Sequence, residues 1–203
     1  MKKITLITML TGALFVSACY VSMPEATDPA VQLENAQRYM DEGNPLAAER
    51  VIMESIRTSE VRNDPEGLGN AYRAFALFLR SPVLARRERT YRETGFLETS
   101  ITYETRQSKS DEYVRRAIEQ YTQAATRYQA RGQYNRLATL YYRQAKTYQL
   151  INETKNACTA YEQSRSAYAE SATRNQSDKP DIPSGFSSFH DAILSAKKRA
   201  GCS

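Results

Sequence analysis

The sequence has little of several residue types that proteins often use for chemistry. Its 203 residues include no tryptophan, one histidine and three cysteines. Eight glycines and seven prolines are too few for a collagen-like or low-complexity chain. A single short apolar run and a mean hydropathy of −0.63 exclude a polytopic membrane protein.

The residues that are present are typical of a globular domain. Hydrophobic residues make up 41% of the chain, and 14 tyrosines and six phenylalanines argue against wholesale disorder. The length suits one domain with a sizeable core. The formal net charge is +5, but the basic residues form no stripe interleaved with aromatics, so we expect no nucleic-acid partner.

The first residues predict an export signal. Lys2 and Lys3 are followed by residues 4–16, which are uncharged and mostly apolar. As a helix this run would span about 20 Å, short of the roughly 30 Å hydrocarbon core of a bilayer. It therefore fits the hydrophobic region of a signal peptide. A buried N-terminal helix is the alternative, but such a helix would carry polar residues at helical period.

The apolar run ends in Val16-Ser17-Ala18-Cys19, with small residues before a cysteine. This order resembles the lipobox of bacterial lipoproteins. The resemblance implies that residues 1–18 are removed and that Cys19 carries a diacylglyceryl group, often with a further acyl chain such as palmitate on its amine. Two or three acyl chains would make membrane attachment effectively permanent. An ordinary cleaved signal that leaves a cysteine is the alternative.

Tyr20 stands where enterobacteria-like sorting uses Asp to retain lipoproteins in the inner membrane. By the same resemblance, Tyr20 implies an outer-membrane protein that is lipid-anchored and faces the periplasm. Residues 19–29 include Ser22, Pro24 and Pro29 and show no apolar period, so we expect a lipidated tether there.

Two further cysteines, Cys158 and Cys202, predict a disulfide if the chain lies in an oxidising periplasm. The bond would close a loop of about 45 residues, stabilise the fold by about 4 kcal/mol and hold the last helix down. Two free thiols, with Cys158 buried as a small hydrophobe, are the alternative. One histidine and two cysteines supply too few ligands for a recognisable metal site, so none is expected.

From Pro29 onward the apolar residues recur at helical period, and no stretch alternates as a strand would. Asp28-Pro29, Asn44-Pro45 and Asp64-Pro65 each combine an N-cap residue with a proline at the first helical position. The sequence therefore predicts an all-α fold. The expected helices are 29–42, 45–59, 65–80, 109–131, 134–151, 153–173 and 186–199.

The spacing of small and aromatic residues repeats within the chain. Steps of 3, 4, 5, 4 and 3 residues separate Ala36, Tyr39, Gly43, Ala48, Ile52 and Ser55. The same steps separate Ala145, Tyr148, Asn152, Ala157, Tyr161 and Ser164. Such a pattern predicts a helical hairpin, in which small residues allow close approach and Gly or Asn makes the turn. A hairpin of this kind cannot bury its apolar face alone, so the hairpins must stack.

This order of positions resembles the tetratricopeptide repeat. A further repeat lies between these two in the sequence. Leu68-Gly69-Asn70-Ala71-Tyr72 fits the start of this middle repeat, and its second helix is displaced to Ala117, Tyr121 and Ala124. The resemblance implies a superhelix of stacked hairpins over residues 30–173, with an insertion at about 81–109. The family's Trp is missing, as is the Pro expected at Glu60. A plain antiparallel bundle is the alternative.

Residues 174–203 complete the expected fold. Residues 174–185 form a connector, and Phe186, Phe189, Ile193 and Ala196 share one face of a short last helix. We expect this helix to cap the end of the stack, as helical repeat arrays require.

The sequence gives little support for catalysis. The sole histidine, His190, lies on the last helix and is more typical of a surface residue than of a base. Ser187 and Ser188 lie nearby, but no strained nucleophile turn is present. No carboxylate pair stands out as an acid and base, and no Gly-rich loop could hold a phosphate. We expect neither an enzyme nor a cofactor.

Binding has more support. Stacked helical hairpins form a concave surface, and the repeat resemblance implies that the first helix of each hairpin lines it. The candidate contact residues on those helices are Asn35, Arg38, Asn70, Arg73, Tyr141, Tyr142, Arg143 and Lys146.

The insertion at 81–109 is a second candidate surface, because long insertions in compact domains are usually functional or disordered. Its basic and aromatic residues could grip an acidic partner, a phospholipid headgroup or a glycan. The partner-binding residues that this interpretation predicts are Arg86, Arg87, Arg89, Tyr91 and Arg92. The alternative is a solvated loop whose arginines are offset by Glu88, Glu93, Glu98 and Glu104.

Taken together, these features predict an outer-membrane-anchored, periplasmic protein-binding scaffold whose partners are envelope proteins. By analogy with the repeat family, such a scaffold could assist the assembly of a pilus or secretion complex. The alternative is an envelope-maintenance adaptor that regulates peptidoglycan enzymes or binds the cell wall.

Overall fold

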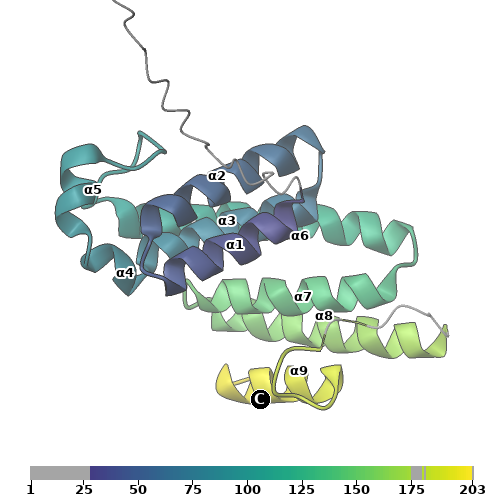
Figure 1. Ribbon diagram of the computed structural model, residues 1–203. Coiled ribbons are helices and arrows are strands. Elements are labelled where there is room, and N and C mark those ends of the chain that lie inside the picture. Colours follow the sequence, from purple (N-terminus) through teal and green to yellow (C-terminus); the bar gives the residue numbers. More distant parts are fainter. Residues whose placement is uncertain (1–27, 175–179, 181, 203) are drawn as a thin grey trace, which may run out of the picture.

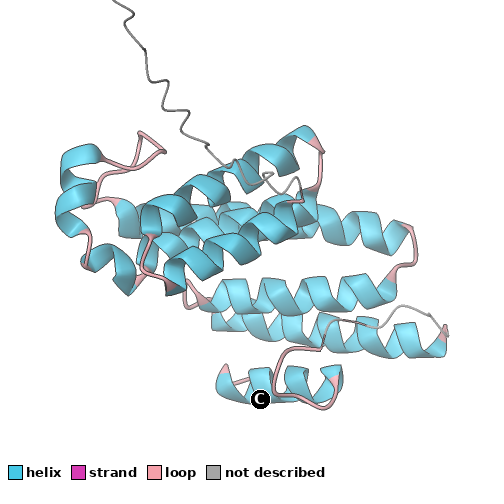
Figure 2. Ribbon diagram, viewed as in Figure 1, coloured by secondary structure: helices cyan, strands magenta, loops and turns pink. Residues whose placement is uncertain are grey.

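The computed structural model of the chain describes residues 28–174, 180 and 182–202, and every regular element within them is a helix (Figures 1 and 2). The prediction of an all-α fold with packed neighbouring helices and a C-terminal helix is confirmed. The expected signal peptide and the lipidation site Cys19 lie outside the described residues.

The long helices begin and end close to the positions that the sequence predicts. Asp28 caps the first helix by accepting a hydrogen bond from the Ala30 N–H at 2.9 Å, and Asp64 caps the third through the Glu66 N–H at 3.1 Å. These caps satisfy N–H groups that have no partner within the helix. The helices of the described chain are α1 (Pro29–Asp41), α2 (Pro45–Val61), α3 (Pro65–Arg80), α4 (Pro82–Ala85), α5 (Glu88–Thr94), α6 (Arg106–Ala130), α7 (Tyr134–Gln149), α8 (Thr154–Thr173) and α9 (Phe189–Arg199).

The long helices pair into three successive hairpins. α1 packs on α2, α3 packs on α6, and α7 packs on α8. α2 contacts α3 and α6 contacts α7, so the pairs stack in chain order, and α9 lies against α8 at the end far from α1 (Figure 1).

The first and third hairpins share the same internal contacts. Ser55 of α2 donates a buried hydrogen bond to the Pro29 carbonyl at 3.2 Å, and Ser164 of α8 donates one to the Ala138 carbonyl at 2.7 Å. Both bonds join residues 26 positions apart. The turns match as well, because Gly43 and Asn152 both adopt positive φ angles, of 73° and 57°.

The second hairpin closes across an interruption in the chain. Gly69 of α3 packs against the ring of Tyr121 on α6, and the Tyr121 hydroxyl donates to Asn70 Oδ1 at 2.9 Å. Tyr121 is fully buried. The displaced second helix that the sequence predicts is therefore α6, which begins at Arg106.

The interruption is folded, so the alternative of a solvated loop is wrong, although Glu88, Glu93 and Glu104 do pair with its arginines as that alternative expected. It contains α4 and α5, neither of which the sequence predicts, followed by an irregular stretch that returns to α6. Its apolar side chains join the core around α3, and the Tyr91 ring stacks on Phe96 with centroids 4.5 Å apart. The buried residues of this segment are Leu84, Tyr91, Phe96, Ile101 and Tyr103.

The last helix covers the third hairpin as expected, although it begins at Phe189 rather than at residue 186. Ser188 caps it by accepting from the Asp191 N–H at 3.1 Å. Phe189 and Ile193 are buried against α7 and α8. The sulfur atoms of Cys158 and Cys202 lie 2.02 Å apart, the distance of a disulfide, so α8 and the end of the chain are tied together.

Gly69→Ala tests the close approach of α3 and α6. The added Cβ would lie 2.7 Å from two atoms of the Tyr121 ring, which has no room to move. We expect the free energy of unfolding to fall by about 1–3 kcal/mol, although alanine favours a helix interior by about 1 kcal/mol. Urea denaturation measures the change. In a Tyr121→Leu background the cost should be smaller, and an equal cost in both backgrounds would contradict the packing argument.

Candidate binding groove

A groove of about 630 Å³ runs between α1 and α3. Its walls are apolar along much of their length, with Leu33 and Met40 on α1 and Ala74 and Leu77 on α3. Leu77 is 38% exposed. The α1–α3 groove therefore presents apolar surface that the described chain does not cover.

One end of the groove is basic and its rim on α1 is acidic. Arg73 of α3 and Arg143 of α7 line it, as does the polar side chain of Asn70. Glu34 and Asp41 line it from α1. The structure thus brings together three of the residues that the sequence assigned to a concave surface.

The other predicted contact residues lie elsewhere. Tyr142 is 6% exposed and packs against Phe189, so its assignment to the binding surface is wrong. Tyr141 lines a separate pocket between α6, α7 and α8. Arg38 forms an exposed ion pair with Glu42 at 3.9 Å and does not line the groove, nor does Asn35.

Glu66 organises the charges where the second and third hairpins meet. Its carboxylate accepts hydrogen bonds from Arg143 at 2.7 Å and from Arg136 at 2.9 Å, and it also accepts one from the Tyr128 hydroxyl. Burial, this bond and the charge of Glu66 together raise the pKa of Tyr128. Glu66 therefore fixes α6 and α7 against the start of α3.

Lys146 lies one turn beyond Arg143 on α7. Burial lowers its pKa, and the positive charges of Arg73 and Arg199 lower it further. Of Arg73, Lys146 and Arg199, which come from three different helices, only Arg73 lines the groove. No carboxylate of the described residues lies within ion-pair distance of Arg73 or Lys146, and the buried Arg73 Nε has no hydrogen-bond acceptor.

The five residues of the insertion that the sequence assigned to partner binding do not form one surface. Tyr91 is 1% exposed and belongs to the core, so it cannot contact a partner. Arg89 pairs with Glu93 at 2.8 Å. Arg86 and Arg87 are exposed, and no ion pair engages either of them within the described chain.

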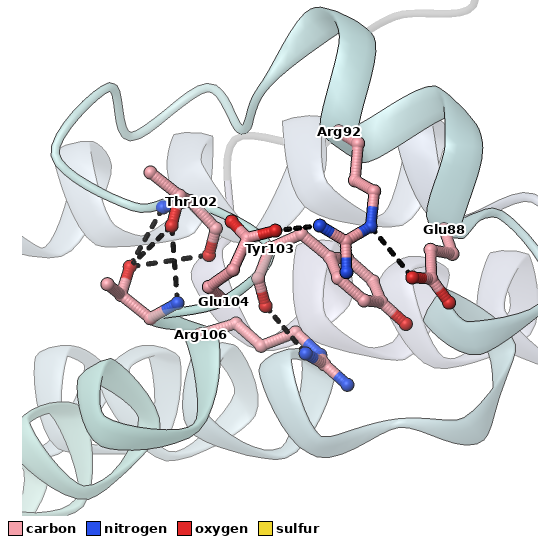
Figure 3. Close-up of polar contacts among 7 residues, drawn as sticks. Glu88, Arg92, Thr102, Tyr103, Glu104 and Arg106 are labelled. Carbon is pink, nitrogen blue, oxygen red and sulfur yellow. Dashed lines mark hydrogen bonds and ion pairs between the residues drawn. The ribbon is translucent and has the colours of Figure 1, made fainter.

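Arg92, the fifth of these residues, is held inside the insertion. Figure 3 shows its guanidinium between Glu88, at 2.7 Å, and Glu104. It also lies over the Tyr103 ring, 4.9 Å from the centroid, and Arg106 lies over the same ring at 3.8 Å. These contacts tie α5 to the stretch before α6, which gives Arg92 a structural role.

Glu49 on α2, which the sequence does not single out as a functional residue, also holds the insertion. Its carboxylate is 1% exposed and accepts a hydrogen bond from the Leu97 N–H at 2.7 Å. Burial raises its pKa from 4.5 to about 7, although the hydrogen bond from the Leu97 N–H opposes that shift. The one sequence signal for the burial of Glu49 is its position next to Ala48, at the edge of the buried stripe of α2.

The residues considered for catalysis have structural explanations. His190 is exposed. Ser187 and Ser188 both donate to the Asp191 carboxylate, at 2.9 and 2.7 Å, and these bonds lower the pKa of Asp191. They form the N-terminal cap of α9. Within the described residues no group of three metal-ligating side chains comes together, and no helix there has the length and apolar content to cross a membrane.

Glu49→Gln tests the electrostatics that hold the insertion. The folded wild type binds the Glu49 proton more tightly than the unfolded chain does. The stability that the protonated Glu49 side chain contributes is therefore fully present below pH 4.5 and is lost as the pH rises through about 7. Relative to Glu49→Gln, the wild type should lose about 3 kcal/mol of unfolding free energy between pH 4 and pH 8.

Urea denaturation at the two pH values measures that loss. Glu119→Gln, on the exposed face of α6, is the matched control and should follow the wild type. A difference between wild type and Glu49→Gln that stays constant with pH would contradict the assignment.

Comparisons of the chain with protein-family models, with curated proteins and with solved structures found no match. The lipobox and the tetratricopeptide pattern therefore rest on the sequence. The structural features that bear on function are the α1–α3 groove and the hairpins that form it.

Proposed function

We propose that the chain is a protein-binding scaffold whose α1–α3 groove receives a segment of a partner. The observation that carries this proposal is the open apolar surface of the groove, formed by Leu33, Met40 and Leu77 on the first helices of two stacked hairpins. Stacked hairpins commonly bind partners on such a face. The shared contacts of the first and third hairpins support a tetratricopeptide-like repeat.

The proposal places the scaffold in the cell envelope. Lipidation at Cys19 would anchor it to the outer membrane, facing the periplasm. The Cys158–Cys202 pair supports an oxidising compartment, because disulfides persist in the periplasm and are rare in the cytosol. The partner would then be an envelope protein, and the repeat resemblance favours a subunit of a pilus or secretion complex.

In-cell crosslinking of the lipid-anchored protein, followed by mass spectrometry, tests the proposal. Leu77→Glu should abolish capture of the partner, because a charged side chain in the apolar wall makes burial of the partner's apolar side chains there unfavourable. Val61→Glu is the matched control, since Val61 is 80% exposed on α2 and does not line the groove. We expect the wild type and Val61→Glu to capture the same envelope protein.

Capture of the same proteins by all three chains would contradict a role for the groove. Sedimentation of the purified protein with cell-wall sacculi, undiminished by Leu77→Glu, would favour the envelope-maintenance adaptor instead.

A further inference from the structure

We propose that the pocket between α6, α7 and α8 binds a neutral saccharide of one or two sugar rings. This α6–α8 pocket has a volume of about 280 Å³. It lies where α6 and α8, the second helices of two neighbouring hairpins, flank α7 (Figure 1). No described residue lines both this pocket and the α1–α3 groove. The inference therefore goes beyond the proposed function and does not depend on it.

The polar lining of the α6–α8 pocket is neutral. A quarter of the residues of the chain are charged, yet every described residue that lines this pocket is uncharged. Burial alone raises the pKa of Tyr141 at the pocket wall, without a contribution from a charged group. An ionic ligand would give up its hydration there without gaining a counter-charge. The pocket therefore favours a ligand that is polar and uncharged.

Several polar side chains of the pocket are free to bind such a ligand. The side chains of Gln129, Tyr141 and Gln163 form no hydrogen bond with any described residue. An amide donates through its nitrogen and accepts through its oxygen, and a phenol hydroxyl also does both. A sugar hydroxyl donates and accepts in the same way, so these three side chains complement the hydroxyl groups around a sugar ring.

Gln144 supplies an acceptor that the fold holds in position. Its side chain is buried, with the residue 6% exposed, and its Nε2 donates to Thr122 Oγ1 at 3.0 Å. Its Oε1 accepts no hydrogen bond from the described residues. An amide that is fixed through its nitrogen has little freedom left to lose when its oxygen accepts from a ligand. Gln144 is therefore preorganised for a ligand hydroxyl.

The apolar lining favours a saccharide over a peptide. It consists of Ala125, Ala160 and the rings of Tyr141 and Tyr148, and no larger aliphatic side chain of the described residues lines the pocket. A bound peptide relies on large apolar anchors that fill matching pockets. A sugar ring instead packs its C–H face on an aromatic ring. The two tyrosines lie two turns apart on α7, about 10 Å, which two linked sugar rings can span.

The test is saturation-transfer NMR of the full-length protein with soluble disaccharides, in a detergent that has no sugar headgroup. The neutral probes are cellobiose, maltose, lactose and di-N-acetylchitobiose, and the charged probe is digalacturonic acid. We expect at least one neutral disaccharide to receive magnetisation from the wild type and digalacturonic acid to receive none. Titration of the neutral disaccharide then gives its Kd.

Variants locate the binding site. Gln129→Ala/Gln163→Ala removes two free amides and should weaken binding by about tenfold. Tyr141→Leu keeps an apolar side chain but removes the ring, so it should also weaken binding. Gln107→Ala/Gln123→Ala removes two exposed amides of α6 that do not line the pocket, and it should bind like the wild type. Thermal melting shows that the variants remain folded.

Three results would overturn the inference. The first is the absence of saturation transfer to every neutral disaccharide. The second is equal binding to the two double variants, because the site would then lie elsewhere. The third is tighter binding of digalacturonic acid than of the neutral probes, which would require a charged site. None of these variants changes the α1–α3 groove, so each result leaves the proposed function as it stands.

Discussion

The close approach of the two helices within each hairpin is the contact on which the structure depends. Ala48 and Ala157 are completely buried at these crossings, and Gly69 performs the same role opposite Tyr121. Because the side chains are so small, Ser55 and Ser164 can each reach a carbonyl of the facing helix. Hairpins joined in this way present their first helices side by side, and the α1–α3 groove follows from that arrangement.

The interruption of the second hairpin has consequences for the same groove. The chain leaves α3 at Ser81 and returns as α6, and the intervening segment packs on α3 through residues such as Tyr91 and Phe96. Ser81, Pro82 and Val83, at the start of that segment, line one side of the groove. Glu49 and Arg92 hold the segment in place, so the insertion contributes to the groove as part of its framework.

The sequence predicts the parts of this fold that local rules govern. Asp28 and Asp64, each followed by proline, mark helix starts, and Gly43 and Asn152 mark turns because both residues tolerate a positive φ angle. α4 and α5 escaped prediction because four and seven residues are too short to show a helical period.

Side-chain burial is harder to predict than helix position. Tyr91 and Arg92 are adjacent and equally suited to a binding surface by composition, yet one is buried and the other is engaged by Glu88 and Glu104. Arg73 and Arg143 could be assigned to first helices from the repeat spacing. Glu66 forms an ion pair with Arg143 but not with Arg73. This difference depends on contacts between hairpins, and the spacing of residues within one hairpin does not predict such contacts.

The most direct test of this account is site-specific photo-crosslinking in cells. A benzophenone amino acid at Leu77 places the probe in the groove, and the same residue at Arg86 places it on the exposed surface of the insertion. We expect a discrete adduct from Leu77 and none from Arg86. An adduct from Arg86 alone would contradict it and would make the insertion the surface that grips the partner.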